Sequence, residues 1–199
     1  MNTRLGVTPD DQALADAVAR FATAEIAPHA QEIDELGLSA TRHRPKLTEL
    51  GLMGMNLPER WGGPGVSSVG LLLAIVEVAR ACASTSSMIG AHYLGSDAVL
   101  IGGNDEQRQH YLPRVASGEF LAGFALTEPR GGSDAAELTT SAVRSGDCYA
   151  LRGVKQFISN AGEADFLVVF AKTDPAAGAR GVSAFIVDTG TPGVTISQP

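Results

Sequence analysis

Two short segments of the sequence combine donors and glycines in a way that suits a flat, anionic cofactor. The first, Phe124–Asp134, is an apolar run that ends at Thr127 and passes into a loop rich in Gly, Pro, Ser and Asp. Thr127 offers a hydroxyl and a backbone N–H, and Ser133 offers a hydroxyl for a phosphate oxygen. The glycine pair that ends at Gly132 would let the backbone approach that phosphate closely and form an anion nest. By spacing alone, the segment fits equally well a strand and a tight turn without a ligand.

The second segment, Lys155–Gly162, follows a predicted strand and ends in a turn. Phe157 could lie along an aromatic ring, and the Ser159 hydroxyl could donate to a ring nitrogen. The alternative is a core phenylalanine beside a turn serine, and for this segment taken alone that alternative is favoured. Neither segment by itself identifies the cofactor.

Several common sites are absent from the sequence. No P-loop and no Gly-x-Gly-x-x-Gly fingerprint follows a predicted strand, which argues against a Rossmann or P-loop nucleotide site. The Gly-x-Ser-x-Gly elbow of an α/β-hydrolase does not occur. The four histidines lack the spacing of metal ligands, so we predict no metal site. They are His29, His43, His92 and His110.

Composition narrows the class of protein. The chain has 199 residues and a formal net charge of −7, which disfavours a nucleic-acid-binding protein because phosphate backbones are held by basic surfaces. Cys82 and Cys148 are too few for a disulfide scaffold or a Cys-rich zinc site, and they fit a reducing cytosol. The most apolar stretch, Val69–Val78, is too short to span a bilayer. Met1–Gly6 lacks the apolar core of a signal peptide, so we expect a cytoplasmic protein.

Up to Gly118, the apolar residues recur with helical spacing. Thr8 is a candidate N-cap ahead of Pro9, and Pro28 should kink or end the helix that follows. The predicted helices form a five-helix bundle. They begin at Thr8, at Pro45, at Ser67 or Ser68, at Ser84 and at Asn104, where Gln107 completes a capping box.

After Gly118, short apolar or alternating runs separated by turn residues predict strands. These are Phe120–Leu126, Leu138–Val143, Tyr149–Val154, Phe166–Ala171 and Ser183–Val187, with a hairpin turn at Ser145–Asp147. Several short strands at this spacing favour a barrel or a sandwich. We therefore predict the α+β class with two domains, a helical bundle over residues 1–118 and a strand-rich domain over residues 119–199.

Taken together, the two segments resemble the acyl-CoA dehydrogenase family, whose signature reads Thr-Glu-Pro, a small-residue loop and Gly-Ser-Asp. Here that signature stands as Thr127–Asp134, with Arg130 in place of a usual small residue. The family's second element, an aromatic residue, Ile, Thr or Ser, and then Asn, stands as Phe157–Asn160. Leu57–Gly63 is similar to the family's Pro-Glu-aromatic-Gly-Gly turn. Order and spacing agree along essentially the whole chain.

The resemblance implies a helical domain followed by a β-barrel domain that binds FAD. The candidate cofactor-binding residues, including Gly132 from the loop, are Phe124, Ala125, Leu126, Thr127, Gly132, Ser133, Phe157, Ile158 and Ser159. The first four would line the flavin ring and the last three would flank it, with the Ser159 hydroxyl directed toward N5. Ser133 would lie near the pyrophosphate and would also contact the acyl-CoA substrate.

The implied activity is FAD-dependent α,β-dehydrogenation of an acyl-CoA thioester. The implied partners are an electron-transfer flavoprotein as electron acceptor and further copies of the chain, in a homotetramer or dimer of the full-length protein. The family's catalytic glutamate belongs to a C-terminal helical bundle, whereas this sequence ends at Gln198–Pro199, around the end of the barrel. Glu128, Glu137 and Glu163 lie in or near the motifs, and we expect turn or surface roles for them. We assign no catalytic residue and expect weak or no turnover from these residues alone.

Two alternatives stay open at this point. One is a flavin monooxygenase or nitroalkane-type oxidase of the same fold, which would use the flavin differently. The other is a non-catalytic binding or assembly protein that retains the barrel without redox activity.

Overall fold

The computed structural model describes residues 6–197, in two compact units that divide between Phe120 and Leu121. Most of the stretch considered as a signal peptide, Met1–Leu5, lies outside the described residues, as does Gln198–Pro199. Within residues 6–197, no helix combines the length and the apolar character that a bilayer crossing requires.

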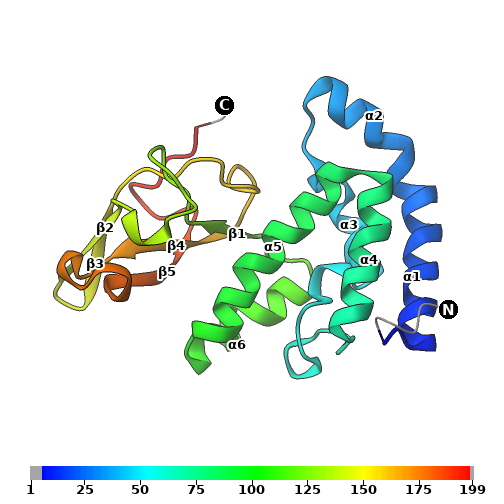
Figure 1. Ribbon diagram of the computed structural model, residues 1–199, viewed down its shortest axis with the longest axis horizontal. Helices are drawn as coiled ribbons and strands as arrows, with labels where there is room; N and C mark the ends of the chain where they lie inside the picture. Colours follow the sequence, from blue (N-terminus) through cyan, green and yellow to red (C-terminus); the bar gives the residue numbers. More distant parts are fainter. Residues whose placement is uncertain (1–5, 198–199) are drawn as a thin grey trace. The chain divides into compact units, whose positions relative to one another are not determined.

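The first unit is helical (Figure 1). Its α-helices are α1 (Pro9–Phe21), α2 (Ala27–Leu36), α3 (Arg44–Glu49), α4 (Ser68–Ala81), α5 (Ala83–Gly102) and α6 (Asp105–Ala116). Short 3-10 turns cover Ala40–His43, Leu52–Gly54 and Glu59–Trp61. Helix α4 lies against both α1 and α5. Large side chains from several of these elements are fully buried between them, namely Ile26, Leu47, Leu52, Met53, Leu57, Ile89 and Leu112.

Pro28 does not end the helical stretch. The chain instead changes from one type of helix to another just before this proline. A π-helical turn, Ala22–Ile26, follows α1, and α2 begins at Ala27 with Pro28 in its first turn. A proline is tolerated there because the first N–H groups of a helix have no acceptor within it. The chain therefore stays helical as far as Gly37, which ends α2 with a left-handed φ of +60°.

Three of the six α-helices named above start at a capping side chain, as the sequence predicts. Thr8 with Asp11 and Asn104 with Gln107 form capping boxes, and Ser67 caps α4. Helix α5, however, begins at Ala83 and not at the predicted Ser84, and its N-cap Cys82 makes no side-chain cap bond. The Cys82 N–H still donates to Val78 O at 2.9 Å. Cys82 is therefore both the C-cap of α4 and the N-cap of α5.

The second unit holds a five-stranded mixed sheet. Its strands are β1 (Ala122–Ala125), β2 (Ser141–Ser145), β3 (Cys148–Arg152), β4 (Phe166–Lys172) and β5 (Val182–Asp188), and a 3-10 turn covers Pro175–Gly181. Strand β4 is central: β1 pairs with it in parallel, β5 pairs with it antiparallel, and β2 joins it in parallel at Lys172. Strands β2 and β3 form an antiparallel hairpin around the predicted Ser145–Asp147 turn.

The central place of β4 follows from its composition. Phe166, Leu167 and Val168 are all buried, so both faces of β4 are covered here, as is typical of a continuous apolar run inside a sheet. The α+β class, with a helical domain followed by a strand-rich domain, is thus confirmed.

Candidate functional site

The two candidate segments lie side by side within the second unit. The Gln156 N–H donates to Thr127 O at 2.9 Å, and the Asn160 side-chain amide donates to Ala122 O at 3.1 Å. Residue numbers rise along one segment while they fall along the other, so residues 156–160 run antiparallel to β1. Two segments that are far apart in the chain are therefore fixed against each other by one backbone bond and one side-chain bond.

Gly123 allows this close approach. A Cβ at this position would lie 2.6 Å from Leu167 Cδ2 and 3.3 Å from Ser159 O. A side chain here would displace the Leu167 side chain and press against the Ser159 backbone, so glycine favours the close contact.

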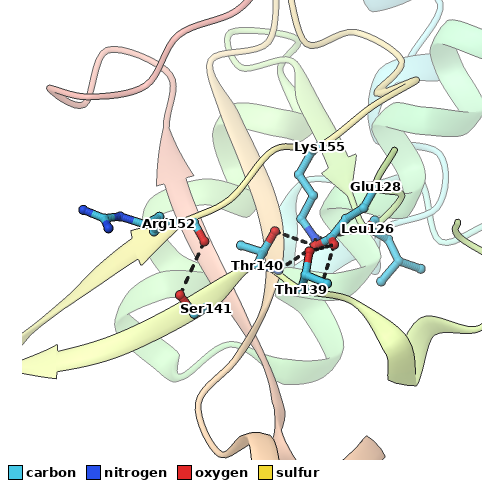
Figure 2. Close-up of polar contacts among 7 residues, drawn as sticks. All are labelled: Leu126, Glu128, Thr139, Thr140, Ser141, Arg152 and Lys155. Atoms are coloured by element: carbon cyan, nitrogen blue, oxygen red, sulfur yellow. Dashed lines mark hydrogen bonds and ion pairs between the residues drawn. The ribbon is translucent and has the colours of Figure 1, made fainter. Parts of the chain in front are cut away.

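A buried carboxylate cross-links the same two segments (Figure 2). The Glu128 side chain is 3% exposed and accepts hydrogen bonds from Thr139 N (2.6 Å), Thr139 Oγ1 (2.6 Å), Thr140 N (2.9 Å) and Thr140 Oγ1 (2.5 Å). Lys155 Nζ lies 2.9 Å from Glu128 Oε1 and also donates to Leu126 O at 3.0 Å. Glu128 does flank a turn, as expected, but its carboxylate is buried and so does not have a surface role.

The surroundings of Glu128 keep it charged. Burial by itself would raise the pKa of the Glu128 carboxyl, but the bonds from Thr139, Thr140 and Lys155 together lower this pKa well below its usual range. A carboxylate held this firmly is a weak base, so Glu128 organises the segments and is not suited to removing a substrate proton.

The loop after Glu128 folds back on Thr127. Glu128 and Gly131 exchange two backbone hydrogen bonds of 3.0 Å, which close the turn through Pro129 and Arg130. Gly132 then packs against the Thr127 side chain, where a Cβ would lie only 2.8 Å from Thr127 Oγ1. Ser133 is exposed immediately beyond this contact.

The Phe157 ring is exposed to solvent, and the backbone of this residue has an unfavourable conformation. Its side chain is exposed, with 84% of the residue surface accessible, and its φ of +58° lies in the left-handed region. Such a conformation costs a bulky residue roughly 1–3 kcal/mol and persists where the surrounding structure enforces it. Asn160 is also left-handed, at φ +68°, which asparagine tolerates better than a bulky residue does.

The other candidate residues divide between core and surface. Ala125 is buried, and Ile158 packs against the small core cluster that Ala125 forms with Ala164 and Leu167. The Phe124 ring packs on another aromatic ring, that of Phe170, at 4.8 Å between centroids. Leu126 and Thr127 are half-buried, and Ser159 is exposed.

Three hydroxyls in this region are available to a ligand. Those of Thr127, Ser133 and Ser159 have no hydrogen-bond partner among the residues that the structure describes. An exposed flat ring, three available hydroxyls and a glycine-lined turn fit a flat anionic cofactor such as FAD. Over the same described range, no cluster of His, Cys, Asp and Glu is arranged to hold a metal ion.

Comparisons with known proteins agree with this description. The model of the acyl-CoA dehydrogenase N-terminal domain matches residues 8–119, and that of the acyl-CoA dehydrogenase middle domain matches residues 123–199. An acyl-CoA dehydrogenase of Bacillus subtilis (strain 168) is 40% identical over 193 residues, covering 96% of this chain and 51% of the relative. The chain spans about half the length of the curated relatives it matches.

Solved structures give the same result. An acyl-CoA dehydrogenase complexed with FAD from Bacillus anthracis superimposes with a TM-score of 0.88 at 34% identity, over 98% of this chain and 34% of that one. A chain from the structure of the electron transferring flavoprotein of Acidaminococcus fermentans gives a TM-score of 0.90 at 38% identity, over 97% of this chain and 50% of that one. Since both domain models match in order and together cover almost all of its length, the chain belongs to the acyl-CoA dehydrogenase family.

Proposed function

We propose that this chain binds FAD and contributes to the α,β-dehydrogenation of an acyl-CoA thioester. The observation that carries the proposal is the antiparallel contact between residues 122–127 and 156–160, which brings segments with an exposed aromatic ring and available hydroxyls together beside β1. Membership of the acyl-CoA dehydrogenase family supports the choice of cofactor and substrate.

The residues would divide the binding of FAD between them. The Phe157 ring would lie along the flavin, and the Thr127 and Ser159 hydroxyls would donate to its polar edge. Gly132 and Ser133 would hold the pyrophosphate, and Ser133 would also contact acyl-CoA. When bound, FAD supplies the acceptor for the hydride that leaves the β carbon of the thioester.

We assign no catalytic base within this chain. Glu128 is buried and already bonded to five donor groups, so it is not free to take the α proton. For these residues alone, we therefore expect little or no turnover.

We also propose an electron-transfer flavoprotein as the electron acceptor and a homo-oligomeric, cytoplasmic protein. The first is supported by the likeness to a chain from the electron transferring flavoprotein structure of Acidaminococcus fermentans. The net charge of −7 supports the exclusion of nucleic acid as a partner.

Visible absorbance tests the function in two steps. The purified chain should bind added FAD, with the perturbed flavin spectrum of a protein-bound cofactor. In the whole protein, anaerobic mixing with an acyl-CoA should bleach the flavin absorbance. A protein that retains no flavin after free FAD is removed would be a binding or assembly protein instead, and a flavin that acyl-CoA does not bleach would indicate a monooxygenase.

A further inference from the structure

We propose that Lys155 is a positioning residue for the cofactor. In this proposal its ammonium group fixes and polarises the Leu126–Thr127 peptide, so that the Thr127 N–H is presented to FAD as a strong donor. The inference rests on the proposed function, because it concerns the same site.

Two hydrogen bonds hold the ammonium group of Lys155 in place. Its Nζ donates to Leu126 O at 3.0 Å and to Glu128 Oε1 at 2.9 Å (Figure 2). The Lys155 side chain is only 10% exposed, so water competes little for these bonds. A hydrogen bond from a cation is roughly twice as strong as one between neutral groups, and a low local dielectric strengthens it further.

The bond to Leu126 O determines where the next N–H points. No described peptide bond is cis, so the Leu126 C=O and the Thr127 N–H point in opposite directions across one plane. With the C=O held toward Lys155, the Thr127 N–H faces away from it. No acceptor for this N–H occurs among residues 6–197.

The neighbouring peptide is held as well. Thr127 O accepts the Gln156 N–H at 2.9 Å, and the Glu128 N–H donates to Gly131 O at 3.0 Å. The Thr127 N–H is thus an available donor between two fixed carbonyls. Because a cation on the carbonyl oxygen polarises the whole peptide, Lys155 also makes this N–H a stronger donor.

The contacts of Lys155 would be the same if it only stabilised the fold. The test must therefore distinguish stabilisation of the fold from positioning of the cofactor. Lys155→Met removes the charge and keeps much of the length of the side chain. In the double variant Glu128→Gln/Lys155→Met both buried charges are gone, so neither is left without a counterion. Lys172→Met, at the end of β4, is the matched control in the same unit.

FAD affinity and flavin midpoint potential are the readouts, with a thermal melt to report folding. For the FAD-loaded protein, Lys155→Met should raise the dissociation constant of FAD by about tenfold. A stronger donor favours the more negative, reduced cofactor. If the variant weakens the reduced form tenfold more than the oxidised form, its midpoint potential falls by about 30 mV for two electrons. Lys172→Met should change neither quantity.

The double variant gives the decisive outcome. A positioning role predicts that FAD affinity and potential stay reduced in the folded double variant, whether or not its melting temperature recovers. Recovery of affinity and potential together with stability would overturn the inference, as would a folded Lys155→Met protein with unchanged values. Failure of the unsubstituted protein to bind FAD would overturn the proposed function itself, and the inference with it.

Discussion

The Leu121 N–H donates to the Asp165 carboxylate at 2.7 Å, and the Asp165 N–H returns a hydrogen bond to Leu121 O at 2.8 Å. Leu121 immediately precedes β1 and Asp165 immediately precedes β4, so this reciprocal pair joins the starts of two parallel strands that are 44 residues apart. Parallel strands have no tight turn to fix their register. The pair therefore sets how β1, with its candidate FAD-binding residues, lies on the central strand.

Replacing the carboxylate should destabilise the second unit. Asp165→Ala leaves the N–H of the fully buried Leu121 without its acceptor, which should lower the free energy of unfolding by about 1–3 kcal/mol. Asp165→Asn keeps an acceptor oxygen and should lower it less. Urea titration followed by circular dichroism measures both values, and an equal loss in the two variants would contradict this role.

His92 should make the first unit sensitive to mild acid. Burial lowers the pKa of His92 to about 4, although its hydrogen bond to Met53 O at 3.0 Å acts in the raising direction. The unfolded chain, with a pKa near 6.5, binds the proton first as the pH falls. The stability contributed by the neutral ring is thus complete above pH 6.5 and is lost progressively toward pH 4, by up to about 3 kcal/mol.

The control for this prediction is His92→Gln, which cannot titrate. It should be less stable than the parent at pH 7, and the difference should narrow as the pH approaches 4. Urea unfolding at several pH values follows the first unit, and parallel curves for the two proteins would show that another group causes the acid sensitivity.

Sequence patterns predicted the elements well where the deciding contacts are local. The N-cap at Thr8 and the capping box of Asn104 need only residues within one helical turn, and the β2–β3 turn joins Ser145 to Cys148. Propensity and cap chemistry act over such distances, so these starts and turns can be predicted from the sequence. The motif residues were also identifiable, because their types and order match a family signature.

The carboxylate cluster could not be predicted in the same way. Glu128 meets its partners across 11, 12 and 27 residues, and a glutamate before a proline in a polar loop is typical of an exposed turn. The same cluster explains why β2 begins at Ser141 and not at the predicted Leu138. The Thr139 and Thr140 N–H groups donate to the Glu128 carboxylate and so are not available to a strand neighbour.

Glu128 should govern the acid stability of the second unit. Its lowered pKa means that the unfolded chain, with a pKa near 4.5, takes up the proton first. The contribution of Glu128 is therefore complete above about pH 4.5 and declines as the pH falls below it. Glu128→Gln should remove this decline and, by leaving Lys155 buried without a counterion, lower stability at pH 7 by about 3 kcal/mol.

Urea unfolding of the second unit between pH 7 and pH 3 measures this effect. The parent and the Glu128→Gln curves should converge as the pH falls. If the gap between them stays constant to pH 3, the carboxylate is not the group that titrates.

The ring of Phe157 should contribute to FAD binding, while its backbone conformation should lower the stability of the protein. Because the ring is 84% exposed, its removal in Phe157→Ala should change stability little while raising the dissociation constant of FAD by up to about tenfold. Phe157→Gly loses the same ring but relieves the left-handed φ, so it should be about 1 kcal/mol more stable than the alanine variant. Thermal melts and FAD titration check both, and an alanine variant as stable as the glycine variant would mean that the backbone is not strained.

Gly132 should support FAD binding because it leaves space for the Thr127 side chain. In Gly132→Ala the new Cβ would lie 2.8 Å from Thr127 Oγ1 and 3.0 Å from its Cγ2, so the threonine or the loop must move. Since Thr127 is a proposed donor to FAD, the dissociation constant should rise by about tenfold. Gly162→Ala is the matched control, because its Cβ would meet no atom within 4 Å and its φ is not left-handed. FAD titration compares the two variants, and equal affinities would mean that the position of Thr127 against Gly132 is not what the cofactor requires.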